Sequence, residues 1–351
     1  MKDVARLAGV SIATVSATLS GSSFVSAVLQ ERVRAAIDEL GYAPNAMASG
    51  LKRGASTLLG LVVPDITNPF YTELVHGVQK RAALAGYTVL LGVSDDDAGR
   101  EAELIRLMRS HQAAGTIVLP SGGEEDCMRL LDIAASMPLV AVDNAPSGMA
   151  ADTVVLDNRK AAQLATDHIL SLDHKAVATI AGPSHRFVSR ERVLGFEAAM
   201  EASGNAVPPE HIIRGDFHVD AARQAAAALL QRSSRPTAIF VANNQMLIGV
   251  MQAIAAAGLC VPDDISIASI DDFPWASVFM PALTTVRQPI DAMAGTAFDF
   301  LAARMAGETT QPRRIVMEPE LVVRQSCGVP RPESTFAYSS PGPSSTASVL
   351  R

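Results

Sequence analysis

The stretch KDVARLAGVSIATVSATLSG, residues 2–21, decides the fold of the N-terminal part of this chain. Its apolar residues keep the i, i+3, i+4 spacing of one helical face as far as Gly9, which suits the left-handed turn that ends a helix. Ser11 then stands where a helix N-cap belongs, and a second apolar stripe runs to Gly21. The pattern predicts two short helices joined by a tight turn, which is a helix-turn-helix.

A third helix is predicted between Ser26 and Gly41, where apolar residues again keep helical spacing. A helix-turn-helix places its second helix in the major groove of DNA, while hydroxyls and backbone amides bind phosphate. Ser11, Thr14 and Ser16 are therefore candidate phosphate-binding residues. The alternative is a three-helix bundle that binds no nucleic acid.

Charge is unevenly distributed along the 351 residues, whose formal net charge is −7. Residues 1–56 carry six basic and four acidic side chains, so a mildly basic head precedes an acidic body. No apolar run approaches the roughly 18 residues of a membrane span, and no signal peptide is recognisable, so a cytoplasmic protein is expected. The three cysteines are far apart, which excludes a disulfide framework and predicts no metal site.

From residue 58 the sequence alternates apolar strands with alanine-rich helices. Continuous apolar strands between helices are typical of parallel α/β sheets covered on both faces, and this many units requires two sheets. The predicted strands are 58–63, 88–93, 116–119, 139–142, 176–181, 238–241 and 265–270. The predicted helices include 71–85, 100–111, 158–172, 190–203, 219–231 and 245–257.

Polar residues follow several of these strands directly. Ligands bind parallel α/β folds beyond the carboxyl ends of the strands, so these residues are candidates for a binding site. They are Asp65, Asn68, Ser94 to Asp97, Asp143, Asn144, Asn243, Asn244, Asp271 and Asp272. Such acceptors and amides, with an apolar face beside them, suit a sugar.

Four segments together resemble the LacI/GalR family of bacterial transcription regulators. They are KDVARLAGVSIATVSATLSG at 2–21, VRAAIDELGYAPNAMASGLKRG at 33–54, LLGLVVPDITNPFY at 58–71 and DDISIASIDDFPWASVFMPALTTVRQP at 263–289. The resemblance spans about residues 2–330. It implies a homodimeric repressor without a cofactor, whose affinity for operator DNA is set by a sugar, sugar acid or phosphosugar.

The resemblance also implies a domain organisation, with a body of two parallel-sheet lobes resembling a periplasmic binding protein. The expected parts are a head at 1–44, a hinge helix at 45–57, lobe one at about 58–158 and 288–318, lobe two at about 159–287 and 319–330, and a tail at 331–351. The tail is rich in Ser and Pro and has no Leu heptad, so we expect it to be disordered.

The head departs from the family at Ala17, at Ser20, where an Asn is common, and at the start of the chain. Ile12, Ala13 and Ala17 occupy base-reading positions, and Ala17 stands where an Arg commonly contacts a base. A bidentate Arg–guanine contact contributes roughly 1–3 kcal/mol of discrimination, which Ala17 cannot supply. We therefore expect an operator that depends less on that guanine. Family members usually also have a Thr before Lys2, which suggests a start upstream of Met1.

The segment from Asn45 to Arg53 resembles the hinge helix of the family, which folds on specific DNA. Leu51 matches the wedge that enters the minor groove, with Asn45 and Lys52 as further expected DNA contacts. The alternative is an ordinary linker with a solvated charge pair.

By resemblance, the effector cleft is lined by Phe70, Asp143, Arg192, Phe217, Asn243, Asp271 and Gln288. Each has a structural alternative: the aspartates as helix caps, Asn243 as a turn residue, Arg192 in a surface ion pair, and the two phenylalanines as core. Asn244 stands where the family more often has Asp. The cluster of His185, Arg186 and Arg190 favours an anionic effector or is an ordinary surface loop, and Trp275 is either a cleft wall or subdomain packing.

Two other classes of protein have a similar α/β architecture. A sugar-binding transport protein would lack residues 2–53 and carry a signal peptide. An enzyme would need a nucleophile, a base or a phosphate-binding loop in a recognisable order, and no such order is found here. The sequence therefore favours a regulator that binds its effector without chemical turnover.

Overall fold

The computed structural model describes residues 1–19, 24–42, 56–232 and 234–331, which form two compact units, Met1–Thr57 and Leu58–Arg351. The predicted hinge contacts Asn45, Leu51 and Lys52 lie outside the described residues. So does the predicted disordered tail apart from Arg331, whose guanidinium forms ion pairs with Asp263 and Asp264.

The head contains the predicted helix-turn-helix. Its helices are α1 (Lys2–Ala8), α2 (Ile12–Leu19) and α3 (Ala27–Glu39). Gly9 ends α1 in the left-handed conformation, with φ 63°. Val4, Val15 and Val33, one from each helix, are fully buried in a small shared core, so the apolar stripes read from the sequence are the packing surfaces.

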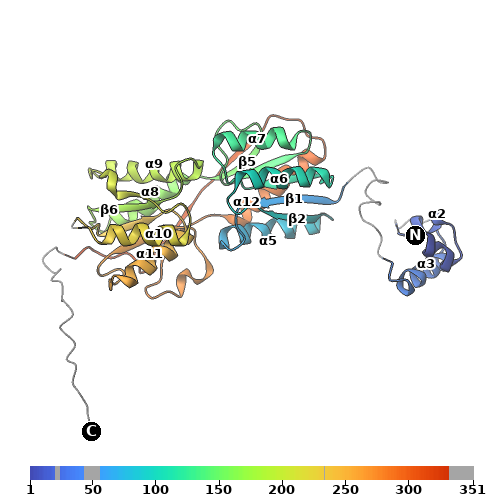
Figure 1. The fold of residues 1–351 in the computed structure, drawn as a ribbon, viewed down its shortest axis with the longest axis horizontal. Helices are drawn as coiled ribbons and strands as arrows, with labels where there is room; N and C mark the ends of the chain where they lie inside the picture. The colour runs from blue at the N-terminus through green and yellow to red at the C-terminus, as the bar shows by residue number, and fades with distance from the viewer. Residues whose placement is uncertain (20–23, 43–55, 233, 332–351) are drawn as a thin grey trace, which may run out of the picture. The chain divides into compact units, whose positions relative to one another are not determined.

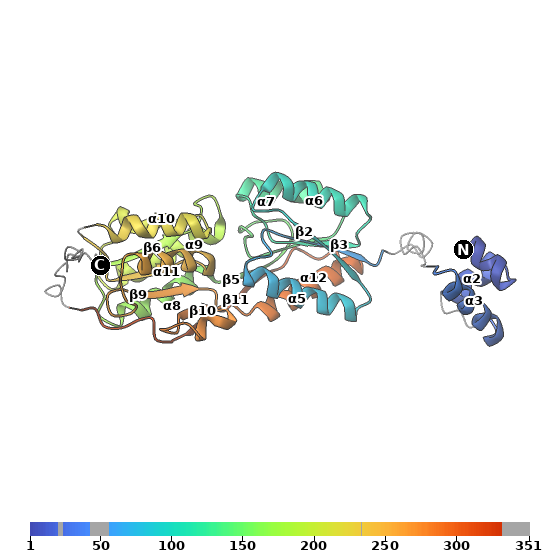
Figure 2. The same ribbon diagram turned by 60° about the horizontal axis from the view of Figure 1, so that its bottom comes forward.

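Lobe one is a sheet of six parallel strands in the order β11-β5-β4-β3-β1-β2. Its strands are β1 (Leu58–Val63), β2 (Thr88–Val93), β3 (Gly115–Val118), β4 (Leu139–Val142), β5 (Asp152–Leu156) and β11 (Arg314–Met317). Figure 2 shows α5 (Pro69–Leu84) and α12 (Ile290–Met305) on one face, and α6 (Ala98–Ser110) and α7 (Glu124–Ala134) on the other. A separate apolar core lies under each helix pair.

Lobe two is a second six-stranded sheet, in the order β12-β10-β9-β8-β6-β7. Its strands are β6 (Val177–Ala181), β7 (Ile212–Arg214), β8 (Ala238–Val241), β9 (Ser266–Ile270), β10 (Thr284–Arg287) and β12 (Glu320–Val322). All pairs are parallel except β10 with β12. Figure 1 shows α8 (Asn158–Leu170) and α9 (Phe187–Ala202) on one face, and α10 (Val219–Leu230) and α11 (Asn244–Ala256) on the other.

The chain passes between the lobes three times, from β5 to α8, from β10 to α12 and from β11 to β12. Both lobes are therefore discontinuous in sequence, and their facing edges are the carboxyl ends of their parallel strands. The helices α7 and α12 and the short strands β5, β7, β10, β11 and β12 are not among the elements predicted from the sequence. The described part of the chain contains no helix long and apolar enough to cross a membrane.

Candidate functional site

A cavity lies between the two lobes at the carboxyl ends of their strands. All seven predicted effector residues line its inner part, together with Asn68, Tyr71, Arg186 and Val188. The outer part has a volume of about 180 Å³ and adds Asp65, Thr67, Asp96 and His218 to the lining. We call this cavity, inner and outer parts together, the cleft.

Asp143 and Asp271 occupy equivalent positions in the two lobes. Asp143 follows β4 with φ 68°, and Asp271 follows β9 with φ 76°. Non-glycine residues held in this left-handed region cluster at binding and active sites. Neither aspartate caps a helix, so that alternative is wrong, and both buried side chains line the cleft.

Arg192 reaches the cleft from α9 and is held in a fixed orientation. Its Nε donates to Asn158 Oδ1 at 2.8 Å and its Nη1 donates to the Ala242 carbonyl at 2.5 Å. The residue is 4% exposed, so the alternative of a surface ion pair is wrong. Two of its donors are occupied by neutral protein oxygens, which leaves a positioned positive charge facing the cleft.

Gln288 and Asn243 supply amides to the same cavity. Gln288 Nε2 donates to Asp271 Oδ1 at 2.5 Å. Asn243 is the N-cap of α11, where its Oδ1 accepts from the Met246 amide at 2.9 Å. The cap leaves the amide Nδ2 of Asn243 as its remaining donor group.

Aromatic rings form apolar walls of the cleft. Phe70 belongs to the core of lobe one and also lines the cleft, with its ring edge-on to Tyr71 at 5.1 Å between centroids. Phe217, with φ 62°, turns its ring over Gly182, where a Cβ would lie 2.2 Å from the ring. A glycine directly after β6 is therefore what allows Phe217 to enter the cleft.

Arg186 and Asp96 join the lobes across the cleft. Arg186 Nη2 donates to Asp96 Oδ1 at 2.6 Å, and the guanidinium lies 5.7 Å from the centroid of the Phe217 ring. Arg186 belongs to lobe two at the start of α9, whereas Asp96 follows β2 of lobe one with φ 60°. Two further polar contacts between the lobes lie close to this ion pair.

The other two contacts are hydrogen bonds. Asn244 Nδ2 donates to Asn68 Oδ1 at 2.9 Å, and Asn144 Oδ1 accepts from the Val188 amide at 3.4 Å. Asn68 Oδ1 also accepts from the Phe70 backbone amide, which fixes it as an acceptor. Its partner must therefore be a donor, so Asn244 makes a bond that an aspartate at this position would not.

Burial raises the pKa of the Asp143 carboxyl to about 6, with Arg192 acting against the shift and Asp271 adding to it. Burial and the nearby Asp143 also raise the pKa of the Tyr71 phenol. Within the described residues, Asp143 Oδ1, Gln288 Oε1 and Arg186 Nε are buried at the cleft without a hydrogen-bond partner. An unpartnered buried polar atom costs about 1–3 kcal/mol, which a polar ligand would recover.

The strand-end pattern could not identify some cleft residues. Tyr71 lies within the helix α5 and not directly after a strand. Asp96 belongs to the predicted range Ser94 to Asp97, but the pattern does not distinguish it from the aspartates on either side. Arg186 was noted in a basic cluster, but its neighbours His185 and Arg190 do not line the inner cleft. Trp275 is 46% exposed and lines an adjacent groove with Pro69, Asn244 and Phe273, at the junction of the lobes.

In the head, the predicted contact residues gather at the start of α2. The Thr14 amide donates to Ser11 Oγ at 3.0 Å, so Ser11 caps α2 as predicted. Ile12 is 47% exposed and Ala13 is also exposed, whereas Thr14, Ser16 and Ala17 are half-buried. The first turn of α2 therefore presents hydroxyls beside small apolar side chains. The described residues contain no cluster of metal-ligating side chains.

Comparison with known proteins agrees with this architecture. Residues 1–45 match the model for bacterial regulatory proteins of the lacI family, and residues 166–327 match a periplasmic binding protein-like domain. The HTH-type transcriptional repressor PurR of Photobacterium profundum is 35% identical over 93% of this chain and 98% of its own. The ribose operon repressor of Escherichia coli K12 is 35% identical over 93% and 99% of the two chains.

Solved structures give the same result. The transcriptional regulator CelR in complex with cellobiose has a TM-score of 0.71 and 31% identity, covering 93% of this chain and 98% of its own. The lac repressor dimer bound to operator and the anti-inducer ONPF has a TM-score of 0.83 and 27% identity over the same shares. Relatives of this identity span nearly the whole chain, head and body together. The protein thus belongs to the LacI family of bacterial transcriptional regulators.

Proposed function

We propose that this protein is a repressor whose affinity for operator DNA is controlled by a small polyhydroxylated effector bound in the cleft. The observation that carries the proposal is the set of unpartnered buried atoms at one cavity, two acceptors and one donor. A hydroxyl group both donates and accepts, so a compound with several hydroxyls satisfies all three. Sugars are the class of compound that fits, and ribose is a first candidate because a relative is named a ribose operon repressor.

The cleft residues take distinct roles in this proposal. Asp143, Asp271 and Gln288 accept from or orient effector hydroxyls, while Arg192 and Asn243 donate to them. Phe70 and Phe217 provide apolar faces for the ring carbons of a sugar. All seven residues line the same inner cavity, and four of them, Arg192, Asn243, Asp271 and Gln288, are held by hydrogen bonds within the protein. The effector is bound and released unchanged, as expected of a relative of transcriptional repressors.

DNA binding is assigned to the head. Ser11, Thr14 and Ser16 bind phosphates, while Ile12, Ala13 and Ala17 face base edges with apolar side chains. Such side chains contact thymine methyl groups but accept and donate no hydrogen bonds, so the operator should depend less on guanine at the position opposite Ala17. Asn45, Leu51 and Lys52 add hinge contacts to the minor groove. A homodimer, as in the lac repressor structure, reads two half-sites in the cytoplasm.

Control requires that the effector favour one arrangement of the lobes. An ion pair and two hydrogen bonds are among the contacts that join the lobes at the cleft, and an effector bound between the lobes changes how readily these contacts form. By linkage, the effector alters operator affinity by the same factor as operator alters effector affinity.

The experiment is a fluorescence-anisotropy titration of the protein on the promoter region upstream of its own gene, with a panel of sugars. We expect salt-sensitive, specific binding that one compound changes. Asp143→Asn should keep DNA binding and lose the response, whereas Thr14→Ala should weaken DNA binding and keep effector binding. Absence of specific DNA binding, or a response retained by Asp143→Asn, would contradict the proposal.

A further inference from the structure

Arg186 is one of two buried arginines at the cleft that a negatively charged effector could bind. Its side chain is 6% exposed, and it lines the inner and outer parts of the cleft. Its terminal Nη2 is already paired with Asp96 at 2.6 Å, across the junction of the lobes. An anionic ligand reaching this guanidinium would have to displace the Asp96 carboxylate or accept it as a close neighbour.

Arg192, the second guanidinium of the cleft, is also electrostatically compensated. It faces Asp143, whose pKa it lowers, and Asp271 lies close enough to Asp143 to raise that pKa. The inner cleft thus holds two arginines and two aspartates, with Asp96 as a third acid on Arg186. A phosphate or carboxylate placed there meets more acidic than basic side chains, and like charges at close range repel each other.

The adjoining space outside Arg186 offers no better anion site. Arg214 also lines this space, but Asp96 and Asp216 line it too, so its two arginines are matched by two aspartates. His218 Nε2 lies 4.0 Å from Asp96 Oδ2. Asp96 therefore places its negative charge beside both Arg186 and His218.

We infer that the effector is electrically neutral, and that Asp96 is the residue that excludes anionic effectors by occupying the Arg186 guanidinium. The inference rests on the proposed function, which it narrows from sugars, sugar acids and phosphosugars to neutral sugars. The buried Nε of Arg186 has no partner in the described part of the chain and is a donor that suits a hydroxyl oxygen of the effector. Asp96 acts as a specificity residue through Arg186 and through its charge.

The test is isothermal titration calorimetry with pentoses and hexoses, each also as its phosphate ester and its aldonic acid; D-ribose, D-ribose 5-phosphate and D-ribonate form one such set. The wild-type protein should bind a neutral member at least about tenfold more tightly than both of its anionic derivatives. Asp96→Asn should narrow that ratio by about tenfold or more, because Arg186 becomes available to the anion.

The matched control is Asp65→Asn. Asp65 lines the outer cleft and carries the same charge, but its carboxylate is bonded to Thr67 and to no arginine. It should leave the ratio nearly unchanged. The double variant Asp96→Asn with Arg186→Gln should lose the gain in anion binding, and circular dichroism verifies that each variant is folded.

Preferential binding of a phosphate ester or aldonic acid by the wild-type protein would overturn the inference, and so would equal narrowing by Asp65→Asn. If such an anion also shifts operator affinity, the proposed function stands and only the inference falls. Neutral-sugar binding that leaves operator affinity unchanged supports the inference and contradicts the proposed function. Failure of every compound to bind contradicts both.

Discussion

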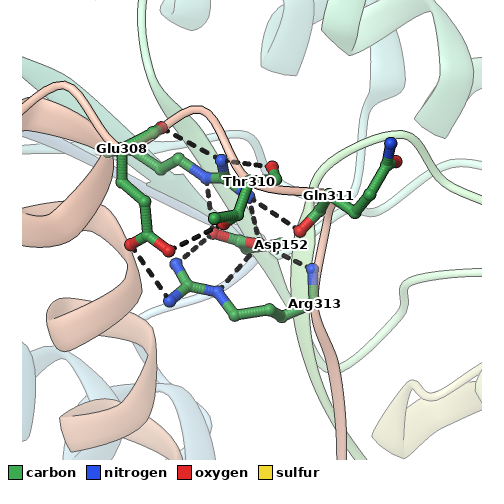
Figure 3. Close-up of polar contacts among 6 residues, drawn as sticks. Asp152, Glu308, Thr310, Gln311 and Arg313 are labelled. Atoms are coloured by element: carbon green, nitrogen blue, oxygen red, sulfur yellow. Dashed lines mark hydrogen bonds and ion pairs between the residues drawn. The ribbon is translucent and has the colours of Figure 1, made fainter.

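Lobe one contains two buried aspartates, Asp152 and Asp143, whose carboxylates have opposite surroundings. Asp152, at the start of β5, has a fully buried side chain, and Figure 3 shows its carboxylate surrounded by donors. Arg304 donates to both of its oxygens at 2.9 Å, and Arg313 donates to them from its backbone amide and its guanidinium at 2.7 and 2.8 Å. Burial alone would raise the pKa of Asp152, but these hydrogen bonds outweigh it and lower the pKa below its ordinary value.

Asp143, which directly follows β4, differs from Asp152 in its hydrogen bonds and in the direction of its pKa shift. It has no such donors within the described residues, one of its oxygens lacks a partner, and burial raises its pKa to about 6. A carboxylate that the protein satisfies internally stabilises the fold, whereas one left unsatisfied beside a cavity is available to a ligand. The comparison separates structural from binding residues without reference to relatives.

The largest effect is expected from Asp152→Ala. Removing the carboxylate leaves Arg304 and Arg313 without their shared partner, and breaking a buried ion pair costs about 3–5 kcal/mol. We expect the lower end of that range, because Arg313 is about one-third exposed. Chemical denaturation of the body measures the free energy of unfolding. A loss below about 1 kcal/mol would show that the arginines find other partners, and it would contradict the conclusion that the Asp152 carboxylate stabilises the fold.

Asp143→Asn should act in the opposite direction on stability and strongly on binding. We expect effector affinity to fall roughly 10- to 100-fold, since hydrogen bonds to a charged group contribute about 1.5–3 kcal/mol. The folded-state pKa of about 6 exceeds the ordinary 3.8, so the charged form costs stability above about pH 6 and not below about pH 4. Relative to wild type, the variant should therefore gain about 2 kcal/mol between pH 4.5 and 7.5. A gain at low pH instead would contradict the assignment.

The raised pKa of Asp143 also predicts a pH-dependent effector affinity. If effector hydroxyls donate to the ionised carboxylate, binding requires loss of the proton, and affinity should fall by up to about tenfold per pH unit below pH 6. Calorimetry at pH 5.0, 6.0 and 7.5 measures the slope. Asp143→Asn should abolish it, and a slope that persists in this variant would assign the titration to another group.

Asn244→Asp tests the hydrogen bond between the lobes. The substitution replaces the donor to Asn68 Oδ1 by an acceptor, so the bond is lost. Because the bond forms only when the lobes approach, effector affinity should fall by about fivefold, corresponding to about 1 kcal/mol. Asn205→Asp makes the same chemical change far from the cleft, where the side-chain amide of Asn205 donates to Ser203 Oγ, and should leave affinity unchanged. Equal effects of the two substitutions would contradict the role of Asn244.

The smallest effect is expected from Glu308→Gln at the rim of the Asp152 cluster. Glu308 is paired with Arg313 at 3.3 Å, and both side chains are about one-third exposed. Partly exposed ion pairs contribute about 0–1 kcal/mol, so stability should change by less than that. A loss comparable to that of Asp152→Ala would mean that the cluster is stabilised as one network rather than by its buried carboxylate.

Local sequence patterns were sufficient to predict much of the fold. Apolar periodicity predicted the three head helices and the strands β1, β2, β3, β4, β6, β8 and β9 to within one residue at most ends. The edge strands β7, β11 and β12 were not predicted from the sequence, because they are only three or four residues long and half-exposed. Their conformation depends on pairing with a neighbouring strand and is weakly encoded in their own residues.

The binding site was predicted in part for the same reason. Residues that directly follow parallel strands must meet at one edge, so Asp143, Asn243 and Asp271 were identifiable from their positions alone. Arg192, Phe217 and Gln288 came from the family resemblance. Which side chains pair was decided by packing of distant segments: Arg186 with Asp96 across 90 residues, Asn244 with Asn68 across 176 and Arg304 with Asp152 across 152. Periodicity and capping act over a few residues, whereas the partner of a buried charge is whatever the folded chain brings within 3 Å of it.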